Sequence, residues 1–182
     1  MGALSDRLDV SPDNIRVSDS SLRLLREILS IAPTPIGIPV PDYFEFPGMC
    51  RDYRLLSRGD GYTVRLPQNE VGSILISNPN NPAGTYSELG ELIEYCRHTQ
   101  TLLIVDEAYI EFAGEELSVA GSENVVVLRT FSKLYGLTDE KVGYAVGPKQ
   151  LLESIRADDA SCDAKRKAQY LLDHPDKQRA VD

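Results

Sequence analysis

The 182-residue sequence contains few of the residues that most often bind metals or form disulfides. It has two histidines, His98 and His174, and three cysteines, Cys50, Cys96 and Cys162, which lie far apart along the chain. An odd number of widely spaced cysteines gives neither an obvious disulfide framework nor a zinc ligand set. Two histidines distant from them are a poor basis for a zinc site or a His-based triad. We therefore expect structural thiols, surface histidines and no metal.

Long apolar runs and runs of basic residues are also missing. No stretch approaches the length that spans a bilayer, and the opening MGALSDRLDV lacks the apolar core of a secretory signal. The chain has 19 basic and 28 acidic residues, a net charge of −9, and no Lys/Arg run that could follow a phosphate backbone. These absences predict a cytoplasmic protein that binds neither membranes nor nucleic acid.

The apolar residues, 42% of the chain, are sufficient for the core of one domain. Unbroken apolar runs at residues 102–105 and 125–128 are typical of strands buried on both faces of a mainly parallel sheet. Residues 74–76 and 142–146 predict two further strands. The proline-rich stretch 33–69 favours extended connections and short strands over long helices.

Helices are predicted between these strands. Polar residues before an apolar 3.6-residue pattern indicate a helix beginning near Ser21. Thr85 and Glu88 have the spacing of a capping box before a second apolar pattern, and Pro148 precedes a third. The charged segment 158–182 predicts one amphipathic helix with a frayed end. Strands alternating with helices indicate the α/β class.

Polar side chains follow three of the predicted strands. They are Asn81, the segment 106–109 and the segment 130–133. Ligands of open α/β sheets bind beyond the carboxyl ends of the strands, so these groups predict one polar site that combines an amide, a carboxylate, a phenol, hydroxyls and a lysine. The residue types alone do not name the ligand.

Three motifs carry a family resemblance. NPNNPAG at residues 78–84, VDEAYIEF at 105–112 and RTFSKLYGL at 129–137 occur in the order found in histidinol-phosphate aminotransferases, and threonine-phosphate decarboxylases share much of the pattern. The chain thus resembles pyridoxal-phosphate enzymes over about residues 8–157. The resemblance implies a truncated, three-layer α/β large domain of fold type I with a mainly parallel sheet. We predict a transferase core at residues 1–157 and a charged helical tail at 158–182.

The resemblance also implies roles for individual residues. Lys133 would form the internal aldimine with pyridoxal 5'-phosphate and shuttle the substrate's α-proton. Asp106 would face the pyridine nitrogen and keep it protonated. Asn81 and Tyr109 would hydrogen-bond the phenolic oxygen. Phe46 would lie against the pyridine face, with Tyr43 as the alternative aromatic residue.

The phosphate is expected to contact the hydroxyls of Thr130 and Ser132 and the helix start at Ser20 and Ser21. The chain departs from the family pattern at two points of this site. Relatives commonly have glycine where this chain has Ser20, and an arginine where it has Lys141, which keeps the charge but loses the bidentate fork. These departures predict weaker retention of the cofactor.

Three functions remain open at this stage. The first is a PLP-dependent aminotransferase that acts on an amino acid or amino-phosphate as a homodimer. The second is a catalytically impaired remnant that serves as a binding or partner-dependent protein, because the match includes neither the family's N-terminal lid nor its small domain. The third is a PLP-dependent decarboxylase, racemase or lyase, since one electron sink serves all of these reactions. The sequence decides neither the substrate nor whether the chain is a fragment.

Overall fold

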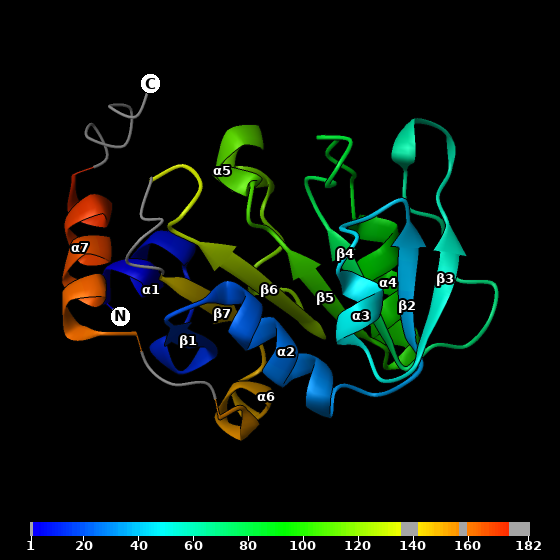
Figure 1. Ribbon diagram of the computed structural model, residues 1–182, viewed down its shortest axis with the longest axis horizontal. Helices are drawn as coiled ribbons and strands as arrows, with labels where there is room; N and C mark the ends of the chain where they lie inside the picture. The colour runs from blue at the N-terminus through cyan, green and yellow to red at the C-terminus, as the bar shows by residue number, and fades with distance from the viewer. Residues whose placement is uncertain (1, 136–141, 157–159, 175–182) are drawn as a thin grey trace.

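A computed structural model describes residues 2–135, 142–156 and 160–174 of the chain. In this part, seven strands form one sheet in the order β1-β7-β6-β5-β4-β2-β3 (Figure 1). The strands are β1 (Ile15–Ser18), β2 (Ile36–Val40), β3 (Tyr53–Ser57), β4 (Ser73–Ser77), β5 (Leu102–Asp106), β6 (Val125–Thr130) and β7 (Gly143–Val146). The five neighbouring strands β6, β5, β4, β2 and β3 are mutually parallel, whereas β7 pairs antiparallel with both β6 and β1. The sheet is therefore mainly parallel, as predicted.

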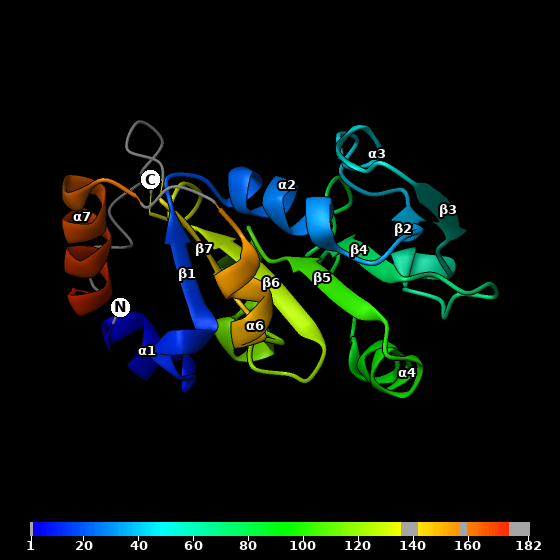
Figure 2. The ribbon, with the colours of Figure 1, turned by 90° about the horizontal axis from the view of Figure 1, so that it is seen from below.

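Helices cover both faces of the sheet (Figures 1 and 2). One face packs against α2 (Ser21–Ile31), α3 (Phe46–Met49) and α6 (Lys149–Ser154). The other packs against α1 (Gly2–Leu8), α4 (Gly90–Thr99) and α7 (Cys162–Asp173). The remaining described helices are short: α5 (Ile110–Ala113), η1 (Pro12–Asn14), η2 (Asp60–Tyr62) and η3 (Glu115–Leu117). This arrangement is the predicted three-layer α/β fold.

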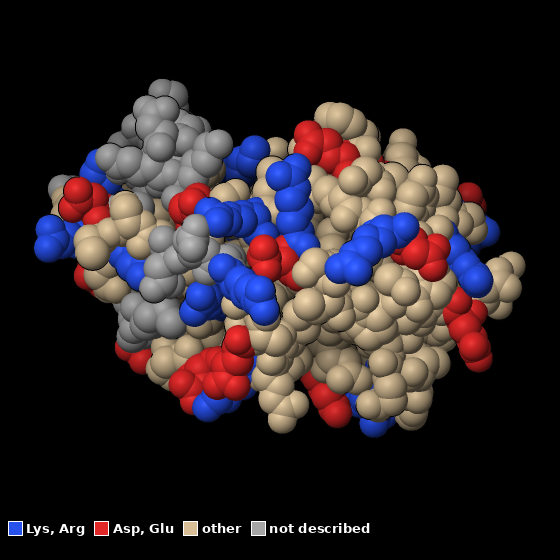
Figure 3. Space-filling model, turned by 60° about the horizontal axis from the view of Figure 1, so that its bottom comes forward, with Lys and Arg blue, Asp and Glu red and all other residues tan. Residues whose placement is uncertain are grey.

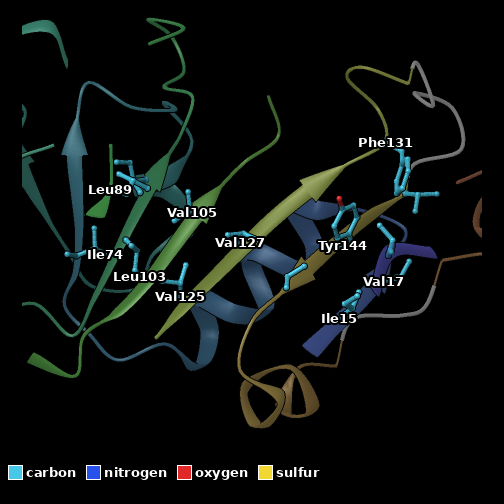
Figure 4. Packing of buried hydrophobic residues seen from close by; sticks show 14 of the residues in the cluster. Ile15, Val17, Ile74, Leu89, Leu103, Val105, Val125, Val127, Phe131 and Tyr144 are labelled. Atoms are coloured by element: carbon cyan, nitrogen blue, oxygen red, sulfur yellow. The ribbon is translucent and has the colours of Figure 1, made fainter. Parts of the chain in front are cut away.

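The apolar runs of the sequence are the central strands. In β6, Val125 and Val127 belong to the core on the α4 side (Figure 4). Val126 and Leu128 belong to the core on the α2 side. Because both faces are covered, successive residues are all apolar, which explains the absence of polar alternation. At about 25 cal/mol per Å² of apolar surface, burial of these side chains is a main stabilising term of the fold.

The helix predicted from the Thr85 capping box begins later than expected. Helix α4 starts at Gly90, Leu89 occupies the N-cap position, and no side chain caps it. The Asn78 amide explains the difference, because it donates to the Ser87 carbonyl oxygen (3.0 Å) and accepts from the Ser87 N–H (2.9 Å). These two bonds keep residues 85–87 in the preceding turn. The helices predicted near Ser21 and Pro148 form at α2 and α6.

Part of the predicted tail packs onto the sheet. Ala160 and Ala168 are buried, and Leu171 and Leu172 of α7 contact the core on the α4 side. The domain division at residue 157 stays a prediction. Within the described segments, no helix is long and apolar enough to cross a membrane. On the face shown in Figure 3, basic and acidic side chains are interspersed.

Candidate cofactor site

A pocket of about 260 Å³ opens at the carboxyl ends of the central strands. It is lined by Ser20, Ser21, Leu22, Tyr43, Asn81, Asp106, Ala108, Tyr109, Thr130, Ser132 and Lys133. The parallel register explains the convergence, since Ser77 at the end of β4 pairs with Asp106 at the end of β5, and Asp106 pairs with Leu128 of β6. Eight of the ten predicted site residues thus lie around one cavity.

Two predicted residues are not among the lining. Phe46, the first residue of α3, is fully buried in the core on the α2 side, and the prediction that it faces the ligand is corrected. Tyr43 packs edge-on against Phe46, with 5.4 Å between ring centroids, and lines the pocket instead. The apolar Phe46 ring fills the space beneath the loop, while Tyr43 presents its ring at the cavity wall. Lys141 lies outside the described residues.

Asp106 is a partly buried carboxylate at the end of β5. Burial raises the pKa of Asp106 to about 6, and the Asp42 charge adds to this increase. The Ala108 N–H, which donates to Asp106 Oδ1 at 3.0 Å, and the charge of Lys133 lower the same pKa. Asp106 is therefore a carboxylate whose charge would be stabilised by a cationic group placed in the pocket.

Lys133 lies in the turn that follows β6 and is exposed. Its ammonium nitrogen is 5.1 Å from the centroid of the Tyr109 ring, within the range of a cation–π contact. The turn is shaped by the Thr130 hydroxyl, which donates to the Val142 carbonyl oxygen (3.3 Å) and accepts from the Ser132 N–H (3.1 Å). Strand β6 thus positions a primary amine on the cavity wall beside a phenol.

The start of α2 forms the opposite wall. The N-cap residue Ser20 has extended backbone angles and makes no side-chain capping hydrogen bond, so N–H groups of the first turn are available to an anion. The helix start approaches β7 closely at Gly143. A Cβ at Gly143 would lie 2.2 Å from the Ser21 nitrogen and 2.7 Å from the Ser21 Cα. Only glycine allows this approach without moving the helix.

Asp42 is a site-building residue that the sequence interpretation missed. Its buried side chain is ion-paired with Arg58 (2.6 Å) and accepts hydrogen bonds from the Ser77 N–H and hydroxyl. The Ser77 oxygen accepts the Asn81 N–H at 2.9 Å. Burial raises the pKa of Asp42, while the Ser77 hydrogen bond is the largest opposing influence. This network joins the loop bearing Tyr43 to the turn bearing Asn81. The signal available in the sequence was a carboxylate two positions beyond the end of β2.

The fold is that of fold-type-I pyridoxal-phosphate transferases. The structure superposes on the histidinol-phosphate aminotransferase from Clostridium acetobutylicum with a TM-score of 0.86 at 19% identity, covering 98% of this chain and 60% of that one. It also superposes on the L-threonine-O-3-phosphate decarboxylase from Porphyromonas gingivalis with a TM-score of 0.81 at 22% identity, covering 97% of this chain and 61% of that one. At these identities, the likeness establishes the fold alone.

Sequence comparison supplies the family. The model of aminotransferase class I and II matches residues 46–170, more than half of the chain, and the protein belongs to this family, whose members depend on pyridoxal phosphate. Histidinol-phosphate aminotransferase 1 of Archaeoglobus fulgidus is 34% identical over 148 residues, which cover 76% of this chain and 46% of that protein. The chain spans about half the length of several curated relatives that it matches.

Proposed function

We propose that this chain is the cofactor-binding core of a pyridoxal-phosphate-dependent aminotransferase. The observation that carries the proposal is the convergence of Lys133, Asp106, Asn81 and Tyr109 on one pocket at the carboxyl edge of the sheet. The four residues come from the ends of three strands, and a scaffold without a chemical role has no physical reason to gather an amine, a carboxylate, an amide and a phenol there.

The described residues fit the cofactor chemically. The uncapped start of α2 and the Ser20, Ser21 and Ser132 hydroxyls offer donors to a phosphate. The Thr130 hydroxyl lines the same wall but already donates to the Val142 carbonyl oxygen. The Asp106 carboxylate, with its raised pKa, suits a protonated ring nitrogen, whose positive charge would lower that pKa and stabilise the carboxylate. The pocket therefore has an anion-binding wall, a carboxylate and a lysine amine within about 260 Å³.

Four residues of this chain would contact the bound cofactor. When bound, pyridoxal phosphate supplies an electron sink for negative charge at the substrate Cα. Lys133 would hold the cofactor through its Nζ and later accept and return the substrate's α-proton at that atom. Asp106 would keep the ring nitrogen protonated. Asn81 and Tyr109 would donate hydrogen bonds to the phenolic oxygen and fix the ring's tilt.

The proposed substrate is an amino acid or amino-phosphate, and the proposed assembly is a cytoplasmic homodimer. The support for an amino-phosphate is the 34% identity to a protein named histidinol-phosphate aminotransferase. Because the chain matches about half of that protein, substrate choice is expected to depend also on groups beyond the matched part.

The proposal is tested by adding pyridoxal phosphate to the purified protein. A visible absorption band that saturates with cofactor is expected for the wild type, and it should be absent from Lys133→Ala. The control is Lys149→Ala, which removes an exposed lysine of α6 that is ion-paired with Asp13 and should keep the band. Amino acids should then convert the bound cofactor to pyridoxamine phosphate, measured chromatographically.

Absence of the wild-type band, or an unchanged band in Lys133→Ala, would overturn the proposal. A saturable band without pyridoxamine phosphate would limit the chain to cofactor binding. Release of carbon dioxide in place of pyridoxamine phosphate would indicate decarboxylation.

A further inference from the structure

Arg129 is a fully buried charged residue directly beside the proposed cofactor pocket. It precedes Thr130 in β6, and neighbouring residues of a strand point to opposite faces. Thr130 therefore lines the pocket, while Arg129 lies on the other face of the same strand end. The proposed function assigns no role to this guanidinium.

The Arg129 side chain contacts the segment that follows β5. Its Nη2 donates to Glu111 Oε1 at 2.9 Å, and the two side chains are 0% and 3% exposed. Glu115 lies at 3.6 Å, and the guanidinium carbon is 5.9 Å from the Tyr144 ring centroid. The Nε and Nη1 atoms have no hydrogen-bond partner among the described residues. A buried ion pair with incomplete hydrogen bonding adds little to the stability of a fold, because the cost of removing the charges from water offsets their attraction. The presence of this pair therefore calls for another explanation.

The contacted segment carries Tyr109. Glu111 belongs to α5, a four-residue helix whose N-cap residue is Tyr109. A single helical turn has little stability of its own and takes its orientation from tertiary contacts. Two of the described interactions join α5 to the rest of the protein: the Ile110 side chain is buried in the core, and Glu111 is ion-paired with Arg129. Tyr109, whose ring centroid lies 5.1 Å from the Lys133 ammonium nitrogen, is thus linked to Arg129 of β6 through α5 and Glu111.

We infer that Arg129 is a positioning residue that holds Tyr109 in the pocket by anchoring α5 through Glu111. The inference rests on the proposed function, because it gives Tyr109 a cofactor to contact. Strand β6 then acts on the pocket in two ways. Thr130 and the following turn residues Ser132 and Lys133 line the pocket, and Arg129 anchors the segment that bears Tyr109 from the other face of the sheet.

The anchor is tested first without cofactor, by hydrogen exchange of the backbone amides. Exchange in residues 107–114 should rise on the order of tenfold in Arg129→Met and in Glu111→Gln, because both remove the charge pair. The matched control is Val125→Ala on the same strand and the same face, which makes a cavity in the core away from α5. Equal exchange of this segment in wild type, Arg129→Met and Glu111→Gln would overturn the inference.

The second arm uses the pH titration of the visible cofactor band. A phenol that donates to the phenolic oxygen lowers that oxygen's affinity for a proton, so Tyr109→Phe should raise the pH midpoint by about half to one pH unit. Arg129→Met should shift the midpoint in the same direction, Arg129→Lys less, and Val125→Ala not at all.

The decisive comparison is the double variant. If Arg129 acts through Tyr109, Arg129→Met should add no further shift in the Tyr109→Phe background. A full additive shift, or no shift in Arg129→Met alone, would contradict the inference. A wild-type protein without a visible band would overturn the proposed function, while the exchange experiment would still decide whether Arg129 anchors α5.

Discussion

At the scale of single residues, Asp106 shows the tension between stability and function most clearly. Its carboxylate ends a buried strand and receives one backbone N–H, while burial raises its pKa to about 6. A protein selected only for stability would gain from a neutral side chain there. The carboxylate becomes favourable when a cation occupies the pocket, and the same feature that disfavours the cofactor-free state therefore favours cofactor binding.

Asp106→Asn should stabilise the cofactor-free protein at neutral and alkaline pH. Between about pH 4 and 6 the folded protein retains a proton that the unfolded chain has lost, so this group lowers the free energy of unfolding as pH rises through that window. The variant should gain up to about 3 kcal/mol at pH 8 and little at pH 4. Urea unfolding at both pH values measures this.

The control for that measurement is Asp60→Asn, which changes an exposed carboxylate of η2 and should give no comparable gain. The same Asp106→Asn protein should lose affinity for pyridoxal phosphate. A variant that is destabilised at pH 8 would show that the Asp106 charge supports the fold rather than the cofactor.

At the scale of elements, the position of α2 decides whether the pocket can hold an anion. The helix start reaches the cavity because Gly143 lets it contact β7 at backbone distance. Helix α2 itself was predictable, since its apolar residues recur at helical spacing after polar residues. Its placement against β7 was not, because the contact depends on a glycine that lies 122 positions after Ser21 in the chain.

Gly143→Ala should weaken cofactor binding by displacing the start of α2. Loss of one or two charge-assisted hydrogen bonds would lower affinity for pyridoxal phosphate on the order of tenfold or more. Gly90→Ala is the control, because a Cβ at that position would meet no atom within 4 Å beyond its chain neighbours and its own helix backbone. Absorbance titration gives both dissociation constants. Equal affinity in the two variants would show that the α2 start does not hold the phosphate.

At the scale of the whole molecule, the α/β class, the mainly parallel sheet and the shared edge of the site followed from the order of apolar runs and polar strand ends. The three-layer architecture was expected from the family resemblance. The direction of β7 could not be predicted, because a short apolar strand has the same sequence pattern in parallel and in antiparallel pairing. Strand β1, with four residues that include Arg16, gave no recognisable signal. Phe46 and Tyr43 differ by three positions, and only the packed loop distinguishes which ring faces the cavity.

The central claim is that one lysine of the folded chain holds pyridoxal phosphate, and covalent mapping tests it most directly. The sequence has six lysines, several of them on the surface, and free pyridoxal phosphate reacts slowly with any exposed amine. Brief incubation with one equivalent of cofactor, borohydride reduction and peptide mass spectrometry should place the label on Lys133. A label spread over the lysines in proportion to their exposure, with Lys133 no more modified than Lys149, would contradict the account.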